Sequence, residues 1–439
     1  AGSMSSSPSR APPPPPASDL SQQKITESVD TLSRRRFLGL GLGTLALSSV
    51  SSSCLSAVSP QAASGTEQLP RQRLRALGIS IGELPTGSFN AMTDVAGVHV
   101  GHATRIHGEG PLVVGQGPVR SGVTAILPRS AENWRQPVWA ADWILNGNGE
   151  LTGTGPVRRS GKLAAPILLT DTGSVGSVYD GALAWMLDQD PTCLDTLPIS
   201  TPVVGETWAN TLHDTGGRHI GTAEVAQAIT SATSGVVPEG CVGGGTGMRA
   251  FRFKAGIGTA SRRVDVESTA YHVGVLVQAN FGGRSHLRVD GVPVGEQIAD
   301  LTPRYGPEPA PDSATIPPPG NSLLVVIATD APLLPNQLQR LCKRAALGAA
   351  RTGAIATHGS GDLLLAFSTA PIVDEGRATR ALHFGHLSGL YQGVVESTEE
   401  AILNSLTMAT TMTGRDDNTI FALPLDRLVQ IMRDHGRLP

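Results

Sequence analysis

Runs of apolar residues alternate along this chain with segments of helical periodicity. Runs rich in Val, Ile and Leu predict strands that are buried on both faces. Apolar positions spaced three and four residues apart predict amphipathic helices. The expected strands are 95–101, 122–127, 166–170, 272–280, 323–329 and 362–368, and the expected helices are 134–146, 174–187, 222–232, 334–351 and 395–411.

The order of these elements predicts an α/β fold. Strands and helices are mixed without a regular βαβ alternation, and several strands are joined by segments too short for a helical crossover. This pattern favours a layered α/β sandwich with largely antiparallel sheets. After residue 70, the proline-rich stretch 303–320 is the one segment that reads as a domain boundary or a long surface loop.

The first 70 residues differ in composition from the rest. Residues 1–3 resemble a cloning scar, and the proline-rich segment after them is expected to be disordered. The basic cluster Arg34–Arg36 precedes an apolar stretch, 37–50, that is shorter than the about 20 residues of a spanning helix. This pattern resembles a twin-arginine export signal, so we expect a periplasmic protein with no stable membrane span.

The four cysteines do not suggest a disulfide framework. Cys54 is a candidate lipoprotein attachment site, but it lacks an aliphatic residue three positions earlier, which favours an ordinary cleavage region. Cys193, Cys241 and Cys342 are odd in number and have no CxxC spacing, which argues against a structural zinc site. Cys342 falls on the apolar face of an expected helix and is predicted to be a core residue.

Composition and missing motifs exclude several classes of function. A net charge of −3 with dispersed basic residues gives no nucleic-acid footprint. Neither Ser322 nor Ser360 lies in a G-x-S-x-G motif. His383 and His386 have no carboxylates at ligand spacing, and "GGGTGM" matches neither a dinucleotide fingerprint nor a phosphate loop. We therefore expect no metal, no cofactor and no nucleic-acid partner.

The junction of Asn321 and Ser322 offers another chemistry. It separates a proline-rich stretch from a buried strand, so its serine is either a turn residue or a nucleophile. If Ser322 attacked the carbonyl of Asn321, an acyl shift and hydrolysis would free an α-amine with an ordinary pKa of roughly 7.7 to 8.0, which can act as a base. The second such pair, Asn404 and Ser405, lies in a helical segment where scissile geometry is unavailable.

Three further residues could support this nucleophile. Ser360 and Asp362 are two apart at a strand entrance and so project on one face, where Asp362 could polarise Ser360 and Ser360 could relay protons with Ser322. Asn280, at the end of its strand, could donate its amide to an oxyanion. A strand-edge turn and a structural cap are the alternative interpretations.

Nine segments together resemble the self-processing aminopeptidases of the L-aminopeptidase/D-esterase (DmpA) family, which includes the β-peptidyl aminopeptidases. The similarity runs in order over residues 75–430, and it implies a four-layer αββα sandwich like that of N-terminal-nucleophile hydrolases but with different connectivity. The segments are "NAMTDVAGVHVGH" (90–102), "SGVTAILPR" (121–129), "LNGNGELTGTG" (145–155), "PVVGETW" (202–208), "GGGTGMRAFRFKAGIGTASR" (243–262), "VGVLVQANFG" (273–282), "GNSLLVVIATDAPLLPNQLQRL" (320–341), "RTGAIATHGSGDLLLAFST" (351–369) and "MTGRDD" (412–417).

The resemblance implies how the chain would mature. Cleavage between Asn321 and Ser322 would divide one catalytic domain into an α subunit, 71–321, and a β subunit, 322–439, with the nucleophile at its start. Further oligomerisation of these αβ units, to a tetramer or larger, is also implied.

The resemblance assigns roles to five other residues. Ser360 and Asp362 match the family's supporting serine and acidic residue, and Asn280 matches its oxyanion asparagine. Glu206 is expected to hold the substrate ammonium, because a free amino terminus needs a carboxylate partner. Trp208 is expected to bind substrate as well. Many members carry an aromatic hydroxyl in the segment after that glutamate, but this chain has no tyrosine over 208–211, so the resemblance does not supply an oxyanion tyrosine.

The sequence therefore predicts a self-activating serine aminopeptidase for short peptides, amides or esters. Three alternatives remain: an acyltransferase of the ornithine-acetyltransferase type, a hydrolase of synthetic amide oligomers, and a binding protein that is cleaved passively. The first two are expected to use threonine, so Ser322 weighs against them. Pocket shape, which the sequence does not give, decides between α-, β- and D-configured residues.

Overall fold

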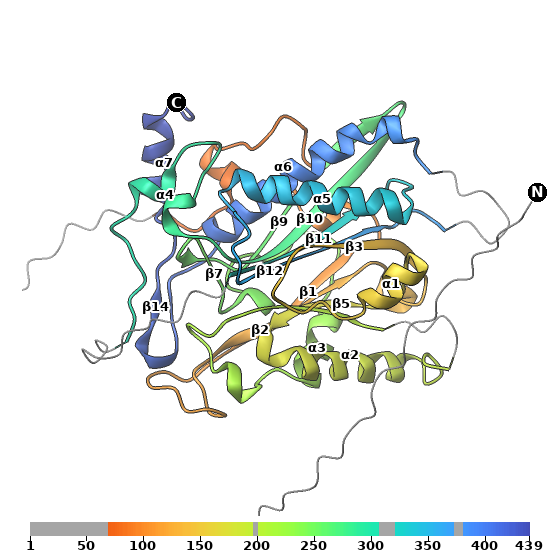
Figure 1. Ribbon diagram of the computed structural model, residues 1–439, viewed down its shortest axis with the longest axis horizontal. Helices are drawn as coiled ribbons and strands as arrows, with labels where there is room; N and C mark the ends of the chain where they lie inside the picture. Colours follow the sequence, from red (N-terminus) through yellow and green to blue (C-terminus); the bar gives the residue numbers. More distant parts are fainter. Residues whose placement is uncertain (1–68, 196–200, 307–320, 373–380) are drawn as a thin grey trace, which may run out of the picture. The chain divides into compact units, whose positions relative to one another are not determined.

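The computed structural model describes residues 69–195, 201–306, 321–372 and 381–439, which form one compact unit (Figure 1). The expected cloning scar, the export signal and Cys54 lie outside the described residues. Among the residues that the structure does describe, none of the helices is long and apolar enough to cross a membrane.

Two β-sheets form the centre of the unit. The first has four strands in the order β1-β2-β5-β6, and the second has six in the order β4-β3-β12-β11-β10-β9. Most neighbouring strands are antiparallel, and the exceptions are β5 with β6 and β11 with β12. The strands are β1 (His99–His107), β2 (Val119–Leu127), β3 (Val138–Gly147), β4 (Lys162–Leu163), β5 (Ile167–Asp171), β6 (Val203–Thr207), β9 (Ile257–Val266), β10 (Thr269–Asn280), β11 (Asn321–Thr329) and β12 (Ser360–Ser368).

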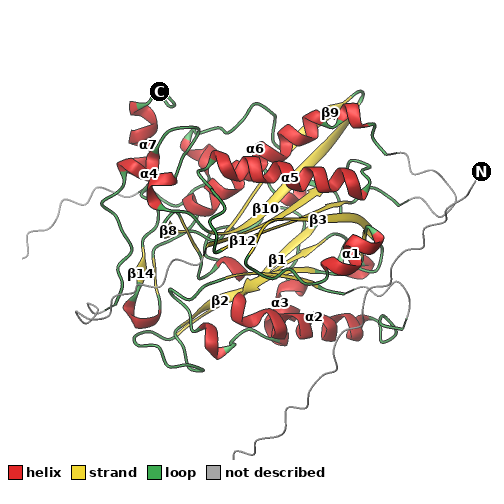
Figure 2. Cartoon of the chain, viewed as in Figure 1, coloured by secondary structure: helices red, strands yellow, loops and turns green. Residues whose placement is uncertain are grey.

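Helices cover the outer face of each sheet (Figure 2). α2 (Val175–Gln189) and α3 (Thr222–Thr230) pack on the four-stranded sheet, while α5 (Pro335–Arg351) and α6 (Ser388–Thr407) pack on the six-stranded sheet. A third apolar cluster, which includes Leu169 and Leu324, lies between the sheets. The four layers confirm the predicted αββα sandwich.

Smaller elements complete the described chain. They are two short hairpins and three helices. The hairpins are β7 (Arg249–Ala250) with β8 (Phe253–Lys254) and β13 (Met412–Thr413) with β14 (Thr419–Ile420), and the helices are α1 (Thr154–Ser160), α4 (Val294–Gln297) and α7 (Leu425–Asp434).

The predicted helix over 134–146 is wrong, because this segment forms β3. Its side chains alternate between two cores, with Val138 and Ala140 facing the space between the sheets and Trp139 and Trp143 packing toward α5 and α6. That alternation has the period of a strand, and pairing with β12 and β4 fixes it. The helical propensity of its alanine and leucine residues is overridden by this pairing.

Two other expectations about buried residues are confirmed. Cys342 is fully buried on α5, where burial raises the pKa of its thiol well above the usual range. Asn404 lies inside α6 and is held there by its side chain, which accepts a hydrogen bond from the Leu74 amide at 3.0 Å and donates one to the Thr259 carbonyl at 3.0 Å. Ser405 is also buried in this helix, so the second Asn-Ser pair is structural.

Candidate active site

Ser322 is the second residue of β11, a central strand of the six-stranded sheet. It lies opposite Asn280 on the antiparallel strand β10 and beside Gly361 on the parallel strand β12. The serine is 5% exposed, and its Oγ accepts a hydrogen bond from the Gly361 amide at 3.4 Å. The side chain of Asn321 lies outside the described residues. Strand pairing thus brings three predicted site segments to one sheet edge.

Ser360 and Asp362 form the expected pair. The Ser360 hydroxyl donates to Oδ1 of Asp362 at 2.8 Å, and both side chains are buried. Burial raises the pKa of the Asp362 carboxyl to about 6, although the hydrogen bond from Ser360 opposes the shift. In the strand register Ser360 stands beside Asn321 and Asp362 beside Leu323, so the pair flanks the position of Ser322.

Asn280 is held by hydrogen bonds at both ends of its amide. Its Oδ1 accepts from the backbone N–H of Arg249 at 3.2 Å, and its Nδ2 donates to the carbonyl of Trp208 at 3.0 Å. The side chain is 1% exposed. These contacts fix its orientation next to Ser322, as an oxyanion donor requires.

Glu206 is the next-to-last residue of β6 in the four-stranded sheet, and its carboxyl group lies close to the strand ends that carry Ser322 and Gly361. Its Oε1 accepts from the backbone N–H of Glu150 at 3.1 Å, and its Oε2 accepts from the hydroxyl of Thr172. A Cβ atom on Gly149 would lie 3.0 Å from Oε1 of Glu206 and 3.3 Å from the Cα atom of Gly361. Gly149 therefore lies between the carboxyl group of Glu206 and Gly361, the residue beside Ser322 in the strand register.

Burial raises the pKa of Glu206, and the nearby carboxylates of Asp171 and Glu150 raise it further. A cation bound at this place would favour the charged form, because an opposite charge favours ionisation. Trp208, two residues further along, is 37% exposed, and its carbonyl holds Asn280. The end of β6 therefore spans the site from the β12 side to the β10 side.

Two asparagines that the sequence analysis did not select hold the turn before Ser360. Nδ2 of Asn146 donates to the carbonyls of Thr357, His358 and Ser360 at 3.0, 3.1 and 2.6 Å, and Nδ2 of Asn148 donates to that of Gly359 at 2.8 Å. Both lie in the quoted segment "LNGNGELTGTG", where two asparagines among glycines are the signal of a backbone-binding turn.

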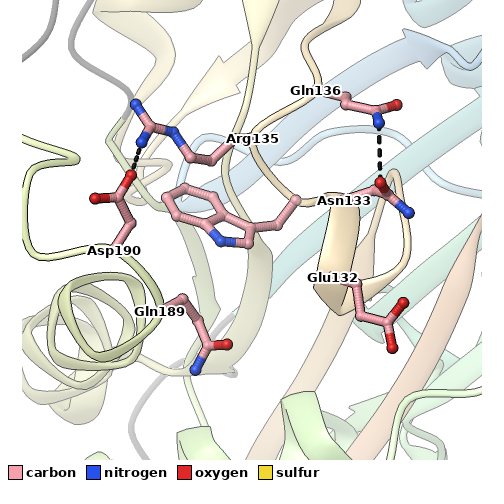
Figure 3. A pocket seen from close by; sticks show the side chains of 7 residues that line it. Glu132, Asn133, Arg135, Gln136, Gln189 and Asp190 are labelled. Carbon is pink, nitrogen blue, oxygen red and sulfur yellow. Dashed lines mark hydrogen bonds and ion pairs between the residues drawn. The ribbon is translucent and has the colours of Figure 1, made fainter.

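Other candidate places do not collect the predicted residues. A cavity of about 310 Å³ lies between residues 132–136 and the end of α2, where Arg135 forms an ion pair with Asp190 (Figure 3). Its lining includes none of the seven predicted site residues. In the described part of the chain, no group of three or more His, Cys, Asp or Glu residues could hold a metal ion.

Comparisons with known proteins agree with this geometry. The model of peptidase family S58 matches residues 90–420. A β-peptidyl aminopeptidase, BapA, from Sphingosinicella microcystinivorans is 44% identical over 379 residues, which cover 83% of this chain and 93% of the relative.

Two similar solved structures carry the same fold. A β-aminopeptidase from Burkholderia sp. is 39% identical with a TM-score of 0.73, and the match covers 84% of this chain and all of the other. The L-aminopeptidase D-Ala-esterase/amidase from Ochrobactrum anthropi, described as a variant of the Ntn hydrolase fold, is 38% identical with a TM-score of 0.75, covering 84% and 99%. This chain therefore belongs to peptidase family S58 and is an aminopeptidase.

Proposed function

We propose that this aminopeptidase activates itself by cutting between Asn321 and Ser322 and then releases N-terminal residues from short peptides, amides or esters. The observation that carries the proposal is the position of Ser322, which lies between Asn280 and Gly361, with the carboxyl group of Glu206 close to these strand ends. A nucleophile, an amide donor and a carboxylate for an ammonium group are the parts that this chemistry needs.

Self-cleavage begins when Oγ of Ser322 attacks the carbonyl carbon of Asn321. The acyl group moves from the nitrogen to Oγ of Ser322, which gives an ester and frees the α-amine. Water then hydrolyses the ester to the Asn321 carboxylate and the Ser322 hydroxyl. The two parts would stay together, because β3, β4, β9 and β10 come from before the cut and share one sheet with β11 and β12.

In turnover, the α-amine of Ser322 takes the proton of its own hydroxyl as Oγ attacks the substrate carbonyl. The hydrogen bonds support this choice over Ser360 as the base. Oγ of Ser322 accepts from the Gly361 amide, whereas the hydroxyl of Ser360 donates to Asp362. Ser360 and Asp362 would thus adjust the pKa of the α-amine, and Asn280 would stabilise the oxyanion.

Glu206 would select substrates with a free amino terminus. A buried carboxylate gains most from a cation that pairs with it and favours its charged form. Because the relatives named above are called β-peptidyl aminopeptidases or β-aminopeptidase, we propose N-terminal β-amino residues as the first substrates to examine. Acyl transfer and amide-oligomer hydrolysis are weaker alternatives, since both are expected to use threonine. A binding protein without activity is disfavoured by the family.

Two further proposals concern the setting of the enzyme. The basic cluster and apolar stretch before residue 50 support export through a twin-arginine signal to the periplasm. Assembly of αβ units into a tetramer or larger oligomer is proposed from the resemblance described above.

The proposal is tested by the intact mass of the purified protein under denaturing conditions. We expect a fragment that begins Ser-Leu-Leu-Val-Val-Ile, and a single uncut chain from Ser322→Ala without amidase activity. Ser405→Ala is the matched control, because it alters the second Asn-Ser pair, and it should be cut normally. Full amidase activity in Ser322→Ala would remove the nucleophile assignment.

A further inference from the structure

Arg249 is a buried cation near the site that the proposed mechanism does not use. It lies on β7 and is 7% exposed. Among the described residues, none of the ion pairs or side-chain hydrogen bonds involves its guanidinium, and its electrostatic neighbours are Tyr305 and the like-charged Arg252. Burial lowers its pKa. A buried charge without a counterion is costly, so this position favours an anion.

The backbone places Arg249 next to the predicted oxyanion group. Its N–H donates to Oδ1 of Asn280, the residue directly opposite Ser322. Arg249 is thus separated from Ser322 by the side chain of Asn280.

Tyr305, the neighbour of Arg249, belongs to the same wall of the site. The next residue, Gly306, donates its N–H to Oδ1 of Asn418 at 3.0 Å, and Nδ2 of Asn418 donates to the carbonyl of Thr211 at 2.9 Å. Thr211 lies three residues after Trp208, whose carbonyl holds Asn280. Asn418 thus links the residue after Tyr305 to the segment that follows β6 by two hydrogen bonds.

Glu206 and Arg249 lie on opposite sides of Ser322. The carboxyl group of Glu206 is adjacent to Gly149 and Gly361 on the β12 side, whereas Arg249 lies beyond Asn280 on the β10 side. A substrate whose ammonium group sits on Glu206 and whose carbonyl faces Ser322 would therefore extend its leaving part toward the β10 side, where Arg249 lies.

We propose that Arg249 binds the terminal carboxylate of the leaving residue, which makes zwitterionic dipeptides the preferred substrates. This inference rests on the proposed function. A guanidinium matches a carboxylate with two parallel hydrogen bonds, and the pair forms where the protein has already removed water from the cation. The distance between Glu206 and Arg249 would then select substrates whose ammonium and carboxylate groups are separated by a matching length.

The test compares a dipeptide with its C-terminal amide, since the two share every residue and the scissile bond. The readout is the ratio of kcat/KM for the acid to that for the amide. We expect the self-cleaved enzyme without substitutions to favour the acid. Arg249→Met should lower the ratio about 10- to 100-fold, the size of one lost charge-assisted pair. Arg249→Lys keeps the charge but loses the two-pronged geometry and should fall between them.

Arg252→Gln is the matched control, because it removes the neighbouring positive charge but not the buried guanidinium. It should keep the ratio of the unaltered enzyme. Intact mass and thermal unfolding are measured on every variant, so that a loss of self-cleavage or folding is recognised. Arg249→Lys serves if Arg249→Met does not mature.

The outcomes separate this inference from the proposed function. An unchanged acid-to-amide ratio in matured Arg249→Met or Arg249→Lys overturns the carboxylate site, as does an equal fall in Arg252→Gln. Failure of the unaltered enzyme to hydrolyse either substrate, with a chain that remains uncut, overturns the proposed function instead.

Discussion

Asn280 and Ser322 face each other across the antiparallel pair β10 and β11, at the edge where both strands meet the site. The asparagine is locked by Arg249 on one side and by Trp208 on the other, so its position depends on segments far apart in the chain. Such locking is what a preorganised amide donor needs, because no energy is then spent on reorientation during the reaction.

Asn280→Ala is expected to lower kcat by about 10²- to 10³-fold, the usual effect of removing one oxyanion donor. KM should change little, because the donor acts on charge that develops during the reaction. Single-turnover and steady-state kinetics on an amino-acid amide would show the split. Asn148→Ala is a useful comparison, because its amide contacts the turn carbonyl of Gly359 and not the oxyanion position. An equal kcat loss in both variants would speak for a general loss of structure.

The pKa of Asp362 predicts how activity depends on pH. The folded state raises this pKa to about 6, so the carboxylate is lost as the pH falls through that value. The proposed α-amine base would give its own decline as the pH falls through its pKa, so we expect Asp362 to add a second decline of kcat/KM below about pH 6. Asp362→Asn should show a low kcat and lack this second acid limb. If the limb persisted in Asp362→Asn, another group would have to be responsible for it.

The same shift predicts an effect on stability of opposite sign to that of a salt-bridged aspartate. A raised folded pKa means that the native state binds the proton more tightly, so stability from this group is lost as the pH rises from about 4 to 6. Asp362→Asn should therefore unfold at a higher temperature than the unaltered protein at pH 8. The difference should shrink toward pH 4. Calorimetry at both pH values measures it.

Segments with a strong periodic signal were predictable from the sequence. The runs that became β10, β11 and β12, and the helical patterns of α2, α3 and α5, lie within a few residues of their expected bounds. Each has a continuous apolar run or a clear helical stripe, because burial alone determines its pattern. The expected strand 95–101 instead begins at His99 as β1, after a short 3-10 turn, and α6 begins earlier than expected, at Ser388.

The missed strands carry patterns that only the tertiary structure explains. β9 contains Arg262, a charged residue that is fully buried because Glu396 and Glu400 on α6 pair with it. A sequence pattern treats an arginine as exposed, so such a strand is not recognised. β6 is only five residues long, and no strand was predicted there. The resemblance drew attention to Glu206 alone.

The candidate site was predictable in its residues but not in its arrangement. Ser360 and Asp362 could be paired by their spacing alone, and the structure joins them at 2.8 Å. The position of Glu206 relative to Ser322 depends on the stacking of two sheets, which no local pattern contains. The role of Arg249 depends on the absence of an acidic partner among the described residues, which likewise needs coordinates.

Glu206→Gln should weaken the use of substrates with a free amino terminus. The amide oxygen can still accept from the N–H of Glu150, and the amide nitrogen can donate to the hydroxyl of Thr172, but the charge that attracts an ammonium group is lost. We expect kcat/KM to fall at least tenfold, mainly through KM. Glu150→Gln is the matched control, since it removes an exposed carboxylate from the same environment, and it should have a much smaller effect. Similar losses in the two variants would assign ammonium binding to the general negative charge of this region.

Adjacent arginines on β9 offer a direct comparison of buried and exposed ion pairs. Arg262 is fully buried, and it pairs with Glu396 at 2.9 Å and with Glu400 at 2.7 Å. Arg263 pairs with Asp265 at 2.9 Å, but both side chains are about half exposed. Removal of one partner from a buried pair leaves an uncompensated charge, whereas an exposed pair is screened by water.

Arg262→Met is therefore expected to lower the free energy of unfolding by about 3 to 5 kcal/mol. Arg263→Met should lower it by less than about 1 kcal/mol. Urea denaturation followed by circular dichroism compares the two variants, after intact mass has established that each is in the same state of maturation. If the buried substitution cost no more than the exposed one, the remaining partners would have to compensate the two carboxylates. These partners are Arg75, which also pairs with Glu400 at 2.9 Å, and the backbone N–H groups that donate to Glu396.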